Sequence, residues 1–203
     1  KDAKLLIDRR GDTELYLALN KGGVCKVFRH DRLVASDTHL SLHVKTRAGT
    51  RNAVGHLIDD YRVQISDDEI EIQGSLGWAK QNRMTPMKLI VLRLAMLSLG
   101  RFFPNLVRKA LQRLLILGKR DAPFAFTRRL RWEQGRWRVI DELQAKSWDR
   151  VVGAGIGGDQ TSIYGVISRT FQQGQLQPWL DLTEQVRQLA AGQPLRLERR
   201  LSP

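Results

Sequence analysis

Apolar residues recur with a period of two along much of the first 79 residues, and this alternation most limits the possible folds. Leu15, Leu17 and Leu19 alternate with more polar neighbours. Successive side chains of a strand point to opposite faces of a sheet, so this period is typical of strands that bury one face. Lys-Gly-Gly at 21–23 is one of several turn sequences between these runs. The pattern predicts short antiparallel strands arranged as a sandwich or meander.

Two hairpins are predicted from runs of strand-like sequence on either side of a turn. The first joins the runs at 63–65 and 70–72 around Ser-Asp-Asp, and the second joins 124–132 to 137–139 around Glu-Gln-Gly-Arg. In the second hairpin, Arg128 shares a face with its apolar neighbours, whereas Arg129 and Arg131 share the other face. Residues 195–201 are predicted to close the sheet as an edge strand.

The periodicity changes to a helical one near Thr85-Pro86, a plausible helix start. Residues 87–99 are apolar nearly all round, and Gly100 and Pro104 separate them from a second, basic amphipathic helix. A shorter helix is predicted between Pro178 and Gly192. The predicted fold is mainly β: one domain over 1–203, an antiparallel β-sandwich with a basic α-helical hairpin inserted at about 85–118 and a short C-terminal helix.

Composition is that of a globular protein, with 42% hydrophobic and 27% charged residues. A transmembrane helix requires about 18 consecutive apolar residues. The richest segment, 87–117, is interrupted by Lys and Arg, and its longest uncharged run is 94–100. We therefore expect no spanning helix. The single cysteine, Cys25, excludes an internal disulfide framework and is expected to be a small, buried or half-buried strand residue.

The net charge of +13 is concentrated in one part of the chain. Residues 80–138 contain 15 Lys and Arg but only 2 acidic residues, whereas the segments on either side are neutral. Arginine accounts for 24 of the 34 basic residues, and its planar fork matches the oxygens of phosphate, sulfate and carboxylate. The candidate anion-binding residues are Arg101, Arg108, Lys109, Arg113, Lys119, Arg120, Arg128, Arg129 and Arg131.

Three interpretations fit this basic region. The helical pair could dock on an anionic membrane, with apolar side chains in the headgroup boundary and basic ones on lipid phosphates. The arginine hairpin, with Trp132 and Trp137, could instead form a groove for nucleic acid or acidic polysaccharide. In a purely structural interpretation, both helices pack on the sandwich and show only a solvated basic face.

Two further motifs have simpler structural explanations. Residues 153–158 match G-x-G-x-x-G, but the preceding apolar run is short and the following segment is strand-like, which favours a glycine-rich loop or bulge over a nucleotide site. His39 and His43 could bind a metal together with Asp37 or Asp59, but they share a strand face with Ser41 and Lys45. A solvated face is the expectation there, so no metal and no cofactor are predicted.

Residues 22–29 and 32–38 form a strand-turn-strand pattern that resembles part of the β-sandwich module of heparinase-type polysaccharide lyases. The pattern covers under a tenth of the chain and includes no catalytic motif. The resemblance implies an accessory sandwich concerned with acidic glycans or envelope polysaccharide, and it transfers no catalytic residue.

The functional hypothesis is a non-enzymatic anion-binding module that docks on an acidic membrane surface as a peripheral protein. The first alternative is an accessory or enzyme domain for acidic polysaccharide, of lyase type if it is an enzyme. Nucleic-acid binding is the third. The sequence does not specify the compartment or the oligomeric state.

Overall fold

The computed structural model describes residues 4–47, 49–58, 60–79, 87, 90, 93, 94, 120–157 and 179–201. The chain consists of two compact units. One consists of Lys1–Ala79 together with Arg120–Pro203, and the other is Lys80–Lys119. The first unit contains every strand that the structure describes.

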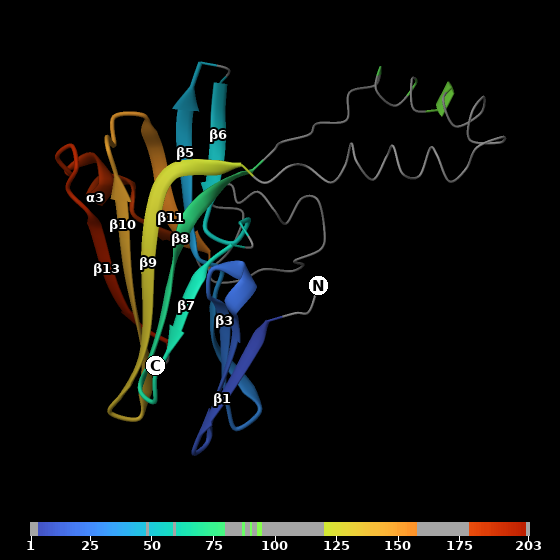
Figure 1. Ribbon diagram of the computed structural model, residues 1–203, viewed down its shortest axis with the longest axis vertical. Coiled ribbons are helices and arrows are strands. Elements are labelled where there is room, and N and C mark those ends of the chain that lie inside the picture. The colour runs from blue at the N-terminus through green and yellow to red at the C-terminus, as the bar shows by residue number, and fades with distance from the viewer. Residues whose placement is uncertain are drawn as a thin grey trace. The chain divides into compact units, whose positions relative to one another are not determined.

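Four strands in the described part of the chain form a first antiparallel sheet in the order β1-β2-β3-β4 (Figure 1). Their bounds are β1 (Leu5–Arg10), β2 (Thr13–Ala18), β3 (Val24–Arg29) and β4 (Arg32–Asp37). A single 3-10 turn, η1 (Leu19–Lys21), connects β2 to β3. The buried residues of β2 alternate with half-buried ones, so the predicted period of two corresponds to one buried face.

The other nine strands of the described ranges form a second antiparallel sheet, ordered β12-β11-β5-β6-β8-β9-β10-β13, with β7 paired to β8. Their bounds are β5 (Leu40–Thr46), β6 (Gly49–Val54), β7 (Arg62–Ile65), β8 (Glu69–Ala79), β9 (Asp121–Glu133), β10 (Arg136–Ala145), β11 (Val151–Gly157), β12 (Trp179–Asp181) and β13 (Leu195–Arg200). A short helix, α3 (Thr183–Arg187), follows β12.

The second sheet curls strongly. The ring of His39, just before β5, meets the ring of Phe126 in β9 with centroids 4.4 Å apart, although β6 and β8 separate β5 from β9 in the sheet. Leu15 and Leu17 of the first sheet join Ile72 and Leu130 of the second in one buried cluster. The two sheets therefore share a single hydrophobic core, as in a sandwich with one curled layer.

The predicted mainly β, antiparallel fold is confirmed. Both predicted hairpins form, as β7–β8 and β9–β10, and β13 pairs only with β10 among the described strands, as an edge strand does. The short C-terminal helix is α3. Cys25 is buried, and burial raises the pKa of its thiol.

The inserted helical hairpin at 85–118 is not supported. It lies outside the described residues except for Met87, Ile90, Arg93 and Leu94, which are helical. Within the described part of the chain, no helix is long and apolar enough to cross a bilayer.

Gly22, between η1 and β3, packs closely against residues of the second sheet and of the Gly55 turn. It adopts a left-handed conformation with φ of +66° at the end of η1. A methyl group there would clash with the carbonyl oxygen of Gly55 and lie 3.3 Å from Cζ of Phe126. Only glycine satisfies both the backbone angle and the lack of space.

Gly22→Ala should destabilise the protein by at least about 2 kcal/mol more than Gly11→Ala. Both residues have positive φ, but a methyl group on Gly11 would have no atom within 4 Å, so that variant reports only the left-handed strain of about 1–2 kcal/mol. Urea unfolding of the two variants measures the difference. Equal losses would contradict the close packing of η1 on the second sheet.

Candidate anion-binding site

Three arginines lie side by side across β9, β10 and β13. Arg138 in β10 is the register partner of Arg131 in β9 and of Arg200 in β13. Directly opposed side chains in antiparallel strands have Cβ atoms about 4.5–5.5 Å apart, so like charges at these positions repel. Each guanidinium of this row therefore benefits from a nearby anion.

Glutamates supply that anion for most of the hairpin. Arg131 pairs with Glu69 of β8, and Nε of Arg129 lies 2.5 Å from Oε2 of Glu71. The hydrogen bond from Arg129 lowers the pKa of Glu71 below its ordinary value. Neither arginine is available to an external anion, because each is already paired with a glutamate carboxylate.

Arg138 pairs with two carboxylates. Its Nη1 lies 2.8 Å from Oε2 of Glu133, and its Nη2 pairs with Glu198 of β13. In contrast, Arg136 and Arg200 make no ion pair within the ranges that the structure describes. Beside the outer end of the hairpin, two arginines therefore have no counter-charge among the residues that the structure describes.

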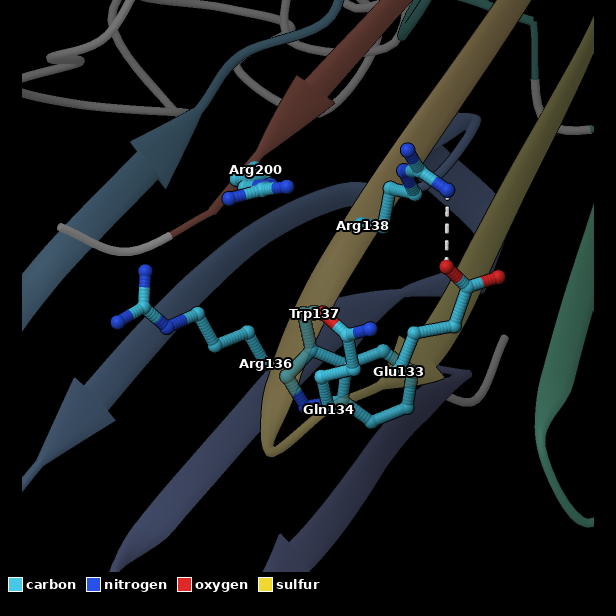
Figure 2. Close-up of a pocket in the computed structure, with 6 residues that line it drawn as sticks. All are labelled: Glu133, Gln134, Arg136, Trp137, Arg138 and Arg200. Atoms are coloured by element: carbon cyan, nitrogen blue, oxygen red, sulfur yellow. Dashed lines mark hydrogen bonds and ion pairs between the residues drawn. The ribbon is translucent and has the colours of Figure 1, made fainter.

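These arginines line a pocket of about 400 Å³ beside the β9–β10 turn (Figure 2). We call it the arginine pocket. Its lining residues are Glu133, Gln134, Arg136, Trp137, Arg138 and Arg200. The volume falls within the range of about 300–1,000 Å³ typical of small-molecule sites. The pocket is polar and cationic, which suits a small oxyanion rather than an apolar ligand.

The sequence-predicted anion-binding residues do not gather in one place. Arg101, Arg108, Lys109, Arg113 and Lys119 lie outside the described residues. Arg120 is exposed immediately before β9. Arg129 and Arg131 point outward, as predicted, but are paired with glutamates. Arg128 is fully buried and therefore unavailable to an external anion, because its partners come from the core.

Sequence reasoning missed Arg136, Arg138 and Arg200. Arg136 is the last residue of the predicted turn of the arginine hairpin and Arg138 follows two residues later, so their place at its end could have been inferred. Their proximity to Arg200 depends on the pairing of β10 with β13, which are separated by a long stretch of chain. That register has no local sequence signal.

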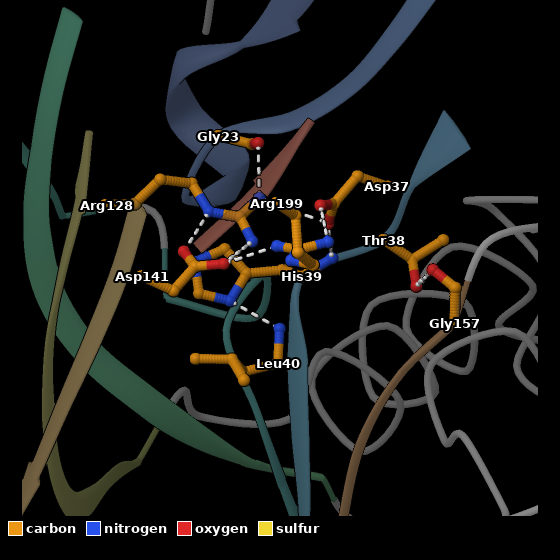
Figure 3. A network of polar contacts seen from close by, with 9 residues as sticks. All are labelled: Gly23, Asp37, Thr38, His39, Leu40, Arg128, Asp141, Gly157 and Arg199. Atoms are coloured by element: carbon orange, nitrogen blue, oxygen red, sulfur yellow. Dashed lines mark hydrogen bonds and ion pairs between the residues drawn. The ribbon is translucent and has the colours of Figure 1, made fainter. Parts of the chain in front are cut away.

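Arg128 belongs to a buried charge network, defined as Asp37, Arg128, Asp141 and Arg199 (Figure 3). Its Nε and Nη2 donate to the two carboxylate oxygens of Asp141 at 2.6 and 2.9 Å. Its Nη1 donates to the carbonyl of Gly23 at 2.9 Å and to Asp37 at 3.2 Å. Arg199 pairs with both aspartates. The network thus links β4 and the start of β3 to β9, β10 and β13.

The network is electrically balanced, with two arginines and two aspartates. Burial alone would raise the pKa of Asp37, but the charges of Arg128 and Arg199 outweigh it and hold that pKa well below its ordinary value. A carboxylate with a lowered pKa and two arginine partners is a poor acid or base. This arrangement supports a structural role for the network.

The expectation that His39 and Ser41 lie on a solvated face is wrong. Both are 0% exposed, although Leu40 and Leu42 on the opposite face are buried as well. The curl of the second sheet is the reason, because it brings Phe126 of β9 against His39. The first part of β5, Leu40–Leu42, is therefore buried on both faces, whereas His43 is half-buried and Lys45 is exposed.

His39 has a constrained geometry. Its φ is +74°, its amide donates to Asp37, and its Nδ1 accepts a hydrogen bond from the amide of Leu40 at 2.7 Å. Nδ1 is therefore unprotonated and the ring proton is on Nε2. Burial, followed by the charge of Arg128, lowers the pKa of His39 well below its ordinary value, with Asp37 opposing this effect.

Gly153 and Gly155 lie in β11, which pairs antiparallel with β5 and has an irregular register between Val151 and Gly153. This matches the predicted bulge and not the parallel strand of a dinucleotide fold. No group of three or more His, Cys, Asp or Glu residues suited to a metal occurs in the described ranges.

Comparisons of the chain with protein-family models, curated proteins and solved structures found no match. The resemblance to the lyase sandwich module therefore remains a prediction, and the functional interpretation depends on geometry and charge.

Arg128→Met should lower the free energy of unfolding by about 3–5 kcal/mol, because it leaves buried aspartates without sufficient compensation. The matched control is Arg129→Met, the next residue along β9, whose partly exposed pair with Glu71 contributes at most about 1 kcal/mol. Chemical denaturation of both variants tests this. A loss for Arg128→Met no larger than for the control would contradict a structural role for the network.

Stability should fall as the pH decreases from about 7 towards 4.5. A histidine whose pKa is depressed in the folded state binds its proton mainly when unfolded, so protonation below the ordinary pKa of 6.5 favours unfolding. Asp37 adds no loss in this window, because its unfolded pKa is 3.8 and its folded pKa is lower.

His39→Asn should flatten this pH dependence. Asparagine tolerates positive φ and stays neutral throughout the window. A smaller slope should remain from His43, whose pKa is also lowered by burial. Melting temperatures at pH values between 7 and 4.5 measure the effect, and an unchanged slope would exclude His39 as its source.

Proposed function

We propose that the protein is a non-enzymatic binding module that docks peripherally on an acidic membrane surface through segment 80–119. The observation that carries this proposal is the distribution of unmatched charge. Segment 80–119 contains nine Lys and Arg and no Asp or Glu. In the β unit, the arginines at 128, 129, 131 and 138 are ion-paired with carboxylates. The excess charge therefore belongs mainly to segment 80–119.

Apolar side chains of the same segment favour a membrane over other polyanions. Met87, Ile90 and Leu94 are helical and 68%, 52% and 61% exposed. Their spacing of three and four residues places them on one helical face. Exposed apolar side chains in a strongly basic segment are typical of elements that enter the headgroup boundary, whereas nucleic acid and polysaccharide offer no comparable apolar phase.

The electrostatic contribution to the free energy of membrane binding is large enough to be measured. A basic residue near an anionic lipid surface contributes about 1 kcal/mol, and the contribution decreases within a Debye length of about 8 Å at physiological salt. Several of the nine basic residues acting together would give reversible binding that depends on acidic lipid and on salt.

The test is co-sedimentation with phosphatidylcholine vesicles that contain or lack phosphatidylserine. The triple variant Arg108→Gln, Lys109→Gln, Arg113→Gln should bind the acidic vesicles at least about tenfold more weakly than the unmodified chain. The control Lys26→Gln, Arg62→Gln, Arg196→Gln removes the same charge from exposed positions of the β unit and should change binding much less.

Equal binding to neutral and acidic vesicles, or no binding to either, would contradict the proposal. Preferential binding to a soluble acidic polysaccharide or to DNA at the same ionic strength would replace the membrane with that polyanion.

A further inference from the structure

We propose that the arginine pocket is a second binding site, which takes the phosphate group of a small phosphate monoester. It lies on the β unit and uses none of segment 80–119, so it does not depend on membrane docking. The grounds are the register of the strands, the distribution of counter-charges and the size of the pocket.

The strand register concentrates positive charge at the pocket. Arg138 and Arg200 are directly opposed in β10 and β13, and Arg136 precedes Arg138 by two residues on the same face of β10. Two opposed guanidiniums repel unless an anion lies between or above them. For Arg129 and Arg131, the sheet supplies that anion from β8. For Arg200 and Arg136, no described carboxylate does so.

Arg138 is held in place while its neighbours remain open. Its Nη1 forms an ion pair with Glu133, and its Nη2 forms an ion pair with Glu198. Glu133, the one carboxylate among the described residues that line the pocket, is therefore engaged by Arg138. Within the described ranges, the guanidiniums of Arg136 and Arg200 have no ion-pair partner, and such planar forks bind phosphate oxygens in pairs.

The wall of the pocket is rigid. Gln134 and Gly135 have φ of +52° and +75°, the pattern of a tight type I′ turn between β9 and β10. Trp137, two residues after Gly135, is 1% exposed, and its ring lies edge-on to Trp132 with the guanidinium carbon of Arg10 5.3 Å from its centroid. A site on such a base needs little ordering when a ligand binds.

Charge and volume select the ligand class. The lining residues include three arginines and one glutamate, a positive excess that complements the charge of about −1.5 to −2 on a phosphate monoester at neutral pH. A pocket of about 400 Å³ also has room for a small organic group beyond the phosphate itself.

The probes are glycerol 3-phosphate, inorganic phosphate and sulfate, titrated into the full chain by calorimetry at low salt. Glycerol 3-phosphate should bind more tightly than sulfate at equal ionic strength. The double variant Arg136→Ala, Arg200→Ala should weaken binding of glycerol 3-phosphate at least about tenfold, because it removes both open forks. Both arginines are exposed, and circular dichroism melting verifies that the variant is folded.

Two further variants test the proposal, because one should leave phosphate binding unchanged and the other should tighten it. Arg196→Ala removes an exposed arginine on the same face of β13, about 13 Å along the strand from Arg200, and should leave binding unchanged. Glu133→Gln keeps an oxygen acceptor for Arg138 but removes the negative charge of the pocket, so it should tighten binding by a few fold. Equal effects of the double variant and Arg196→Ala, or weaker binding by Glu133→Gln, would overturn the proposal.

Vesicles distinguish the source of the phosphate and separate this site from membrane docking. If the soluble ester is the ligand, the double variant Arg136→Ala, Arg200→Ala should bind phosphatidylserine vesicles like the unmodified chain. If the phosphate belongs to a lipid headgroup, the double variant should lose binding to phosphatidic acid vesicles while the affinity for the soluble ester is weak in both proteins. Full binding of every probe by the double variant would refute the site.

Discussion

The fold depends on a buried charge network of two arginines and two aspartates. Moving such ions out of water costs several kcal/mol each, so the network is tolerable only when every member has its partners. Asp37 ends a strand of the first sheet, whereas Arg128, Asp141 and Arg199 belong to the second. Closure of the two sheets and neutralisation of the four charges therefore occur together. Apolar burial drives the sheets together, and the network specifies how they are aligned.

This dependence explains which predictions from the sequence succeeded. Hairpins such as β7–β8 and β9–β10 were predictable because a local alternation and a short turn define them. The alternation also placed Arg128 on the same face as its apolar neighbours, but the prediction still made it an anion-binding residue. Its structural role was not predictable, because its partner Asp37 is 91 residues away and nothing near Arg128 indicates an acidic partner in the core. A sequence rich in arginine shows where charge is, but not which charges are already neutralised.

Two other features could be recognised only from the three-dimensional fold. His39 and Ser41 were expected on a solvated face because β5 alternates cleanly, but the curl of the sheet covers that face as well. The arginine pocket required the register between β10 and β13, which are distant in sequence. The basic side chains therefore fall into three groups. Some belong to the buried charge network, some line the arginine pocket, and the remainder are concentrated in segment 80–119.

The place of Arg199 on the edge strand β13 has a consequence for how the protein is made. A chain emerges from the ribosome N-terminus first, and Asp37, Arg128 and Asp141 are all present before β13 has been synthesised. At that stage one arginine faces two aspartates, so closing the sheets would bury an uncompensated carboxylate. We therefore expect the nascent chain to remain open until residue 199 has left the exit tunnel.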